Sequence, residues 1–270
     1  MGPHRAQSLR YENGAWSASD ELLTPEALLQ IRVNGVPYTT TVRSPGHDEL
    51  LARGLLFGEG LLPPAPLACE FEHVLDPETR IVGALDLRIR EEHLLRPVDD
   101  RRSVAATASC GLCGVREAKD LRLHGGALRE QPGEQLEPSR FTPMMERMAA
   151  RQANFNATGG AHAAAAFTID GELLAAHEDI GRHNAVDKVI GELIVNRTLA
   201  TARCLTVSGR LSYEIVYKAF HAAIPILISV SAPSSMAVEM GERFGLTIVG
   251  FCRDGRATVY ARPGRIVTSA

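Results

Sequence analysis

Two cysteines two residues apart, Cys110 and Cys113, are the side chains of this sequence best suited to chemistry. Ser109, Gly111 and Gly114 surround them with small residues, which leave both sulfurs accessible and permit backbone conformations that bulkier residues resist. The spacing is compatible with half of a zinc site, with a thiol–disulfide pair, or with a nucleophilic thiolate that its neighbour assists or resolves. The spacing alone does not choose among these chemistries.

A zinc site is the main rival to a reactive thiol pair. A structural zinc needs four ligands, and the sequence has no second C-x-x-C or closely spaced Cys/His pair. His47 and Glu49 do form the H-x-E pattern of zinc nucleobase deaminases ahead of the cysteines. Ser109 stands where that signature has proline, and the separation is long for the pattern. A zinc nucleobase deaminase is therefore kept as an alternative.

The composition is that of an ordinary globular protein, with 45% hydrophobic and 23% charged residues and a net charge of -3. This charge gives no basic field for nucleic acid. No secretory signal opens the sequence and no apolar run is long enough to cross a membrane, so we expect a cytoplasmic protein without membrane contact. Five cysteines, an odd number, do not indicate a disulfide framework, and we expect the close pair to be reactive.

The length of 270 residues leaves room for two domains, which we place at 1–135 and 136–270 because the stretch 125–138 has the composition of a linker. The first is expected to be a smaller β-rich subdomain that carries the cysteine pair. An Asn34-Gly35 hairpin turn is its clearest signal. The expected elements are strands over 9–16 and 28–42, a helix over 48–59, and a hairpin of strands over 71–75 and 81–89.

The second part has helical and strand patterns in alternation, which predicts an α/β sandwich with a parallel sheet; the fold class is α/β, or α+β overall. Ser234 and Gly245 are expected to begin and end one of its helices. The expected helices are 141–152, 182–195, 212–223 and 234–244; the expected strands are 163–169, 173–177, 204–207, 226–230, 247–251 and 257–261. Residues 263–270 look like a frayed tail.

Three loops follow strands of the parallel sheet, at 208–212, 231–235 and 252–256. They bring serines, small residues and three arginines to the edge where ligands bind in open α/β sheets. Arginine forks and free helix amides suit phosphates, so we expect a nucleotide-containing ligand. The structural alternative is that the serines only begin helices, that Asp254-Gly255 is a hairpin turn, and that the arginines are solvated.

A fourth polar stretch, 177–184, lies between an apolar strand and an apolar helix face and suggests the wall of a cleft. Alternatively, the polar residues of this stretch have only a structural role at the start of the helix. Asp179 could accept from helix amides, while Glu178 with Arg182, and His183 with Asp187, have the spacing of helical side-chain pairs.

Taken together, these motifs resemble the FdhD family, the sulfur carriers of formate dehydrogenase. The stretches that carry the resemblance are 109–114, 177–188, 208–210, 231–235 and 250–253. The resemblance implies a sulfurtransferase that accepts persulfide sulfur from a cysteine desulfurase. It delivers this sulfur to the molybdenum or tungsten bis-guanine-dinucleotide cofactor before formate dehydrogenase receives it. A cofactor-binding chaperone without sulfur transfer is the alternative from another class.

The resemblance also implies a fold like that of cytidine deaminase and a homodimer. Cys110 would bear the persulfide, and Cys113 would receive, shield or resolve the sulfur. The metal would be held by the cofactor itself, so no protein ligand to it is expected. The residues expected at the cofactor are His177, Ser208, Arg210, Ser231, Phe251, Cys252, Arg253, Asp254, Gly255 and Arg256.

Overall fold

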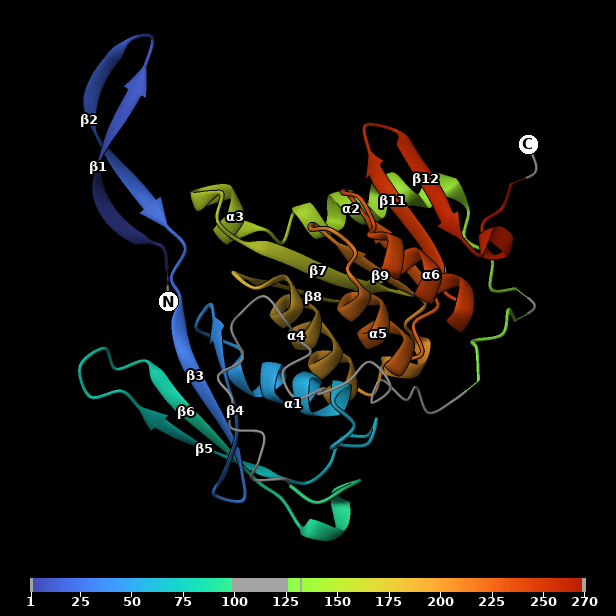
Figure 1. Cartoon of the computed structure of the whole chain (residues 1–270), viewed down its shortest axis with the longest axis horizontal. Coiled ribbons are helices and arrows are strands. Elements are labelled where there is room, and N and C mark those ends of the chain that lie inside the picture. Colours follow the sequence, from blue (N-terminus) through green and yellow to red (C-terminus); the bar gives the residue numbers. More distant parts are fainter. Residues whose placement is uncertain (1, 99–125, 132, 269–270) are drawn as a thin grey trace.

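The computed structural model describes residues 2–98, 126–131 and 133–268. These residues form six α-helices and three sheets, so the chain has the mixed α/β class that its sequence predicts (Figure 1). Cys110 and Cys113 lie outside the described residues. No helix in the described ranges is both long enough and apolar enough to span a membrane.

The chain begins with a two-stranded antiparallel hairpin that stands away from the rest of the molecule (Figure 1). Its strands are β1 (His4–Glu12) and β2 (Ala15–Leu23). The predicted single strand over 9–16 is wrong, because Asn13 and Gly14 take left-handed conformations, with φ of 50° and 85°, and form a tight turn inside it. An Asn-Gly pair is a strong hairpin signal, and it applies here as it does at residues 34–35.

A four-stranded sheet follows, with the strand order β4-β3-β6-β5. The strands are β3 (Ala27–Val33), β4 (Val36–Arg43), β5 (Glu70–Leu75) and β6 (Val82–Arg88). Both predicted hairpins are confirmed, since β3 pairs with β4 and β5 with β6 in antiparallel register. Helix α1 (Asp48–Gly58) connects β4 to the second hairpin, close to its predicted bounds.

The largest sheet has six strands in the order β12-β11-β10-β9-β7-β8. Its strands are β7 (His162–Phe167), β8 (Leu173–Asp179), β9 (Cys204–Val207), β10 (Ile226–Ser229), β11 (Thr247–Arg253) and β12 (Arg256–Ala261). The predicted parallel sheet is confirmed for β9, β10 and β11. Because β7 is antiparallel to both β8 and β9, β8 also runs parallel to these three.

Helices cover both faces of this sheet, and alternate strand residues point into two separate cores. Leu205 of β9 faces the core beneath α4, α5 and α6, whereas Cys204 faces the core beneath α2. The helices are α2 (Phe141–Ala149), α3 (Ala153–Thr158), α4 (Arg182–Val195), α5 (Tyr213–His221) and α6 (Ser235–Phe244). Ser234 caps α6 and Gly245, with φ of 73°, ends it, as predicted.

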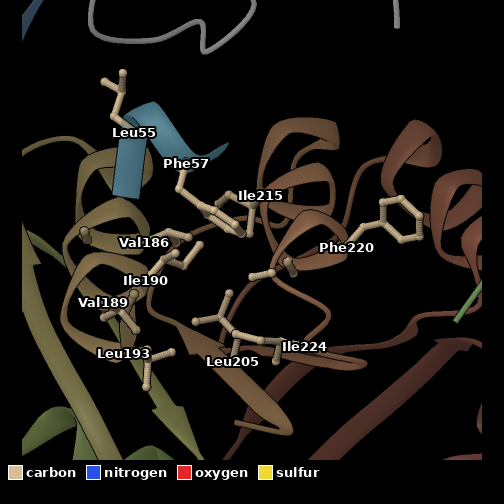
Figure 2. Close-up of a cluster of buried hydrophobic side chains, with 14 of the residues drawn as sticks. Leu55, Phe57, Val186, Val189, Ile190, Leu193, Leu205, Ile215, Phe220 and Ile224 are labelled. Atoms are coloured by element: carbon tan, nitrogen blue, oxygen red, sulfur yellow. The ribbon is translucent and has the colours of Figure 1, made fainter. Parts of the chain in front are cut away.

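Helix α1 lies directly on α4. Gly54 and Gly191 form the crossing: a Cβ atom on Gly54 would stand 1.9 Å from the Asp187 carbonyl oxygen, and one on Gly191 would stand 2.0 Å from that of Leu50. Figure 2 shows side chains of α1, α4 and α5 directed into one cluster, part of a hydrophobic core that holds residues from both sides of position 135. The division at that position stays a prediction.

The tail is not frayed over its first residues, contrary to the prediction. Arg265 is 1% exposed and donates hydrogen bonds to the carbonyl oxygens of Gly245 and Leu128, at 2.7 and 3.2 Å. Its Nε lies 3.0 Å from Glu134. The tail and the segment after residue 126 therefore hold each other against the body of the protein. Sequence patterning missed this because a single buried arginine has no periodicity.

Candidate functional site

The loops that follow β9 and β10 lie side by side at the carboxyl edge of the six-stranded sheet. The Leu211 amide donates to the Ala232 carbonyl at 3.2 Å, and the Ser234 amide donates back to that of Leu211 at 2.9 Å. The Ser229 hydroxyl donates to the Gly209 carbonyl at 2.6 Å. This edge of the sheet is the position where α/β proteins bind their ligands.

Ser208, Arg210 and Ser231, predicted at the ligand, are all found at this edge. The Ser208 hydroxyl accepts from the Ala163 amide at 2.8 Å, which holds the end of β9 against β7. Arg210 is exposed, so its guanidinium is available to a ligand. The Ser231 carbonyl accepts from the Phe251 amide at 3.1 Å, which joins the second loop to β11.

Residues 251–256 form the tip of a hairpin between β11 and β12. β11 pairs with β10 only over Thr247–Val249, so the hairpin extends past the neighbouring strand. Asp254 and Gly255, with φ of 53° and 69°, make the turn, which confirms that part of the structural alternative. Arg253 and Arg256 pair across the turn and are exposed, which gives the tip two adjacent cations.

Two further residues of this hairpin differ from their neighbours. Phe251 has a φ of 51°, an uncommon conformation for a residue with a side chain, and it lies at a bulge where the residue is 40% exposed. Cys252 points the other way, into the core beneath α2, and is 3% exposed. Burial raises the pKa of its thiol to about 11. Any contact of Cys252 with a ligand at the edge would therefore come from its backbone.

The stretch between β8 and α4 is held by buried charges and by the end of β4. Asp179 is fully buried, 2.7 Å from Lys188 Nζ, and accepts from the amides of Gly181 and Ser44 at 2.8 and 3.1 Å. Lys188 donates to the Ser44 carbonyl at 3.0 Å. Buried ions persist when they are paired and hydrogen-bonded in this way. The first part of the chain thus fixes the start of α4.

The helical pairs considered for this stretch do not form. Glu178 instead accepts from the amides of Asn154 and Phe155, both at 2.8 Å, at the beginning of α3. His183 Nε2 lies 2.6 Å from Glu214 Oε2 of α5. The carboxylates at this junction therefore bind groups from other elements, which spacing along one helix cannot reveal.

His177, predicted at the cofactor, lies away from the loops after β9 and β10. Its Nε2 is 2.8 Å from Glu192 Oε2 of α4, and its ring packs edge-on against that of His47 at 4.7 Å. Burial lowers the pKa of His177 to about 4, with smaller contributions from His47 and Lys188, and burial raises the pKa of Glu192. Both shifts favour the uncharged forms of the two side chains.

The H-x-E pattern does not bring its two side chains to one partner. His47 packs on His177, whereas Glu49 Oε1 lies 3.3 Å from His73 Nε2. Within the described ranges, no group of three or more His, Cys, Asp or Glu side chains is arranged to hold a metal ion.

His162, which no sequence pattern singled out, begins β7 at the carboxyl edge, beside the loop that follows β9. A Cβ atom on Gly209 would stand 3.2 Å from His162 Nδ1 and 3.7 Å from Arg182 Cδ, so glycine leaves room for both side chains. Burial, followed by the charge of Arg182, lowers the pKa of His162. The buried Nε of Arg182 makes no hydrogen bond within the described part of the chain. His162 reaches this edge because β7 runs antiparallel to its neighbours, and the hydrophobic pattern of a strand does not reveal its direction in the sheet.

The fold and this edge define a mixed α/β protein in which α4, α5 and α6 begin at the carboxyl edge of the largest sheet. The FdhD/NarQ family model matches residues 24–267, and the chain belongs to this family. A protein of Streptomyces avermitilis named sulfur carrier protein FdhD is 40% identical over 98% of this chain and 96% of its own length. Its namesake in Sulfolobus acidocaldarius is 37% identical over 95% of this chain and 96% of its own length.

A solved structure has the same fold. It is a protein of Desulfotalea psychrophila described as a formate dehydrogenase accessory protein, and it matches with a TM-score of 0.75. The two chains are 22% identical, and the match covers 99% of this chain and all of the other.

Proposed function

We propose that this protein is a sulfur carrier that takes persulfide sulfur from a cysteine desulfurase and delivers it to a molybdenum or tungsten bis-guanine-dinucleotide cofactor. The observation that carries the proposal is the match, over nearly the whole length of the chain, to proteins named sulfur carriers. The C-x-x-C pair of the sequence supplies the thiols that such a carrier needs.

The sulfur step needs only a thiolate on this chain. The Cys110 thiolate attacks the outer sulfur of the donor persulfide, a new S–S bond forms, and the donor cysteine leaves as a thiolate. Cys113 then receives the sulfur by the same exchange, or shields the Cys110 persulfide. These exchanges between thiols require no external oxidant, because the sulfur keeps its oxidation level in each of them.

The guanine-dinucleotide cofactor is the substrate that would occupy the carboxyl edge. Its phosphates are matched by the amino ends of α5 and α6, where the helix dipole favours anions. The start of α4 already holds the buried carboxylate of Asp179. Arg210, Arg253 and Arg256 are exposed and supply positive charge at or near the same edge. The proposed partners are the cysteine desulfurase, formate dehydrogenase as the client, and a second copy of this chain; the proposed fold likeness is to cytidine deaminases.

Intact-mass measurement tests the sulfur step directly. The purified protein is incubated with a cysteine desulfurase and cysteine, and a gain of one sulfur atom is expected. Cys110→Ala should abolish the gain and the maturation of formate dehydrogenase in a deletion strain. Cys69→Ala is the matched control, because this half-buried thiol contacts Arg53 and its pKa is raised by burial. Full maturation by Cys110→Ala would sink the proposal and favour a chaperone that does not carry sulfur.

A further inference from the structure

The N-terminal arm, residues 4–23, has one apolar face. Cross-strand partners share a face, so the pairs Tyr11–Trp16 and Leu9–Ala18 lie on the same side, with Leu22 two rows nearer the body. Leu9, Tyr11 and Trp16 are 70%, 61% and 69% exposed. The Tyr11 and Trp16 rings touch, with centroids 5.1 Å apart. Large side chains this exposed on one contiguous face mark an interaction surface.

The opposite face of the N-terminal arm is mostly polar and bonded within itself, with Leu23, 49% exposed, as its one large apolar side chain at the base. The Ser8 hydroxyl donates to the Ser19 carbonyl at 3.1 Å, and Arg10 and the Ser19 hydroxyl both donate to Glu21, at 2.5 and 2.7 Å. The arm is therefore two-sided, as a strand pair is when one side is to be covered.

Among the residues that the structure describes, the body of the protein makes its contacts with the N-terminal arm at the base of the arm and leaves the apolar rows uncovered. The arm touches the rest of the molecule near its base, where β2 meets α3 and the Thr24 and Thr158 hydroxyls are 2.6 Å apart (Figure 1). A two-stranded hairpin is marginally stable alone in water and gains stability from a further packing layer.

We infer that the apolar face of the N-terminal arm packs against the same face of a second copy of this chain. The inference rests on the second copy named in the proposed function and assigns the surface where the copies meet. Leu9, Tyr11, Trp16 and Leu22 together expose on the order of 500 Å², given the areas that such side chains bury. Two such faces reach about 1,000 Å², the size at which a specific interface begins.

Charge also favours a second copy over a different partner. Besides its apolar rows, the face presents one cation, Arg5, and one anion, Asp20. A face of one sign would repel its own copy, whereas this face carries both signs and can complement itself across a two-fold axis.

The only tryptophan of the chain, Trp16, lies in this face and makes the inference directly measurable. Tryptophan emission and light-scattering mass are followed while the full chain is diluted from micromolar to nanomolar concentration. We expect a dimer whose emission moves to longer wavelength as it dissociates, because the indole becomes hydrated. Leu9→Ser with Tyr11→Ser should shift the dissociation to at least tenfold higher concentration and leave the emission that of a hydrated indole.

Ser17→Ala with Ser8→Ala, on the polar face, is the matched control and should dissociate like the wild type. A dimer that the apolar-face variant leaves unchanged would place the interface elsewhere and overturn the inference, while the proposed pairing of copies would stand. A monomeric wild type at all concentrations would overturn both. Sulfur loading of the same samples, measured by intact mass, reports separately on the sulfur-carrier proposal.

Discussion

Cys204 and Cys252 are held as neutral thiols by the core beneath α2. Burial raises the pKa of both, to about 11 for Cys252. Only a thiolate reacts readily with an alkylating reagent. In the native protein at about pH 8, near the ordinary pKa of a thiol, we expect iodoacetamide to leave both unmodified.

Peptide mapping by mass spectrometry checks this prediction, with the guanidinium-unfolded protein as the control in which both cysteines should react fully. Equal rates for Cys252 in the native and unfolded states would contradict its burial. The result also decides whether native labelling can be used to follow Cys110 and Cys113 without interference from Cys204 and Cys252.

His177 makes the stability of the fold sensitive to acid. Its pKa is about 4 in the folded protein and about 6.5 when unfolded, so between these values the unfolded chain binds a proton that the folded chain does not. Stability is therefore complete above about pH 6.5 and is lost as the pH falls toward 4. We expect this one group to cost up to about 3 kcal/mol, at roughly 1.4 kcal/mol per pKa unit.

The measurement is the guanidinium unfolding free energy of wild type and His177→Gln across this pH range. The difference between the two proteins should shrink on acidification, because only the wild type loses the contribution of a neutral, buried imidazole. His4→Gln changes an exposed histidine of the N-terminal arm and should follow the wild type at every pH. Parallel profiles for wild type and His177→Gln would show that His177 does not carry the effect.

At the scale of residues, the sequence predicted which positions gather at the sheet edge better than it predicted their partners. Ser208 and Ser231 lie where strand order places them, because loops after parallel strands share an edge. Glu178 and His183 have partners in α3 and α5, and spacing along one helix contains no information about a second helix. His162 could not be found without knowing which way β7 runs.

At the scale of elements, the contact between α1 and α4 depends on two glycines. A methyl group at Gly54 or Gly191 would overlap a backbone carbonyl of the other helix, which cannot move aside as a side chain can. We expect Gly54→Ala and Gly191→Ala each to destabilise the protein by about 3 kcal/mol or more, at the upper end for overpacked cores.

Gly58→Ala is the matched control in the same helix, because the nearest atom to its Cβ would be the Lys218 Nζ at an ordinary 3.5 Å. Guanidinium midpoints compare the three variants, and Gly58→Ala should lie within about 1 kcal/mol of the wild type. If Gly54→Ala were as stable as this control, the helices would not cross at the distance that the structure shows.

Hydrophobic periodicity predicted most elements of the fold because each element buries one face. Burial of one face leaves apolar residues at a period of about two residues in a strand and about 3.6 residues in a helix. The bounds of α4 are those of the pattern at 182–195. The differences have local causes: the Asn13-Gly14 turn divides the apparent strand over 9–16, and one buried arginine, Arg265, holds the tail. The sequence also did not predict that α1 packs on α4. Each helix has an apolar face, but an apolar face does not indicate which element will cover it.

At the scale of the whole molecule, the first part of the chain completes the second. The Ser44 amide and carbonyl bind the buried Asp179–Lys188 pair, and the Asn184 side chain donates to the Val42 carbonyl at 2.7 Å. These contacts set the junction at which α4 begins, next to the candidate ligand edge. The site therefore depends on the four-stranded sheet and α1 even though its own loops come from the larger sheet.

The two parts are accordingly expected to unfold together and not to fold apart. A fragment of residues 136–270 would keep the Asp179–Lys188 pair but remove its hydrogen bonds to Ser44, and it would expose the face of α4 that α1 covers. A buried polar group left without its hydrogen-bond partner costs about 1–3 kcal/mol, and more when the group is charged. Thermal denaturation followed by far-ultraviolet circular dichroism should show one transition for the full chain and none for this fragment.

A chain that begins at residue 24 is the control. It lacks only the N-terminal arm and should keep a cooperative transition, because the arm touches the body near its base. A cooperative transition of the 136–270 fragment at the temperature of the full chain would mean that the core does not join the parts as the contact between α1 and α4 indicates.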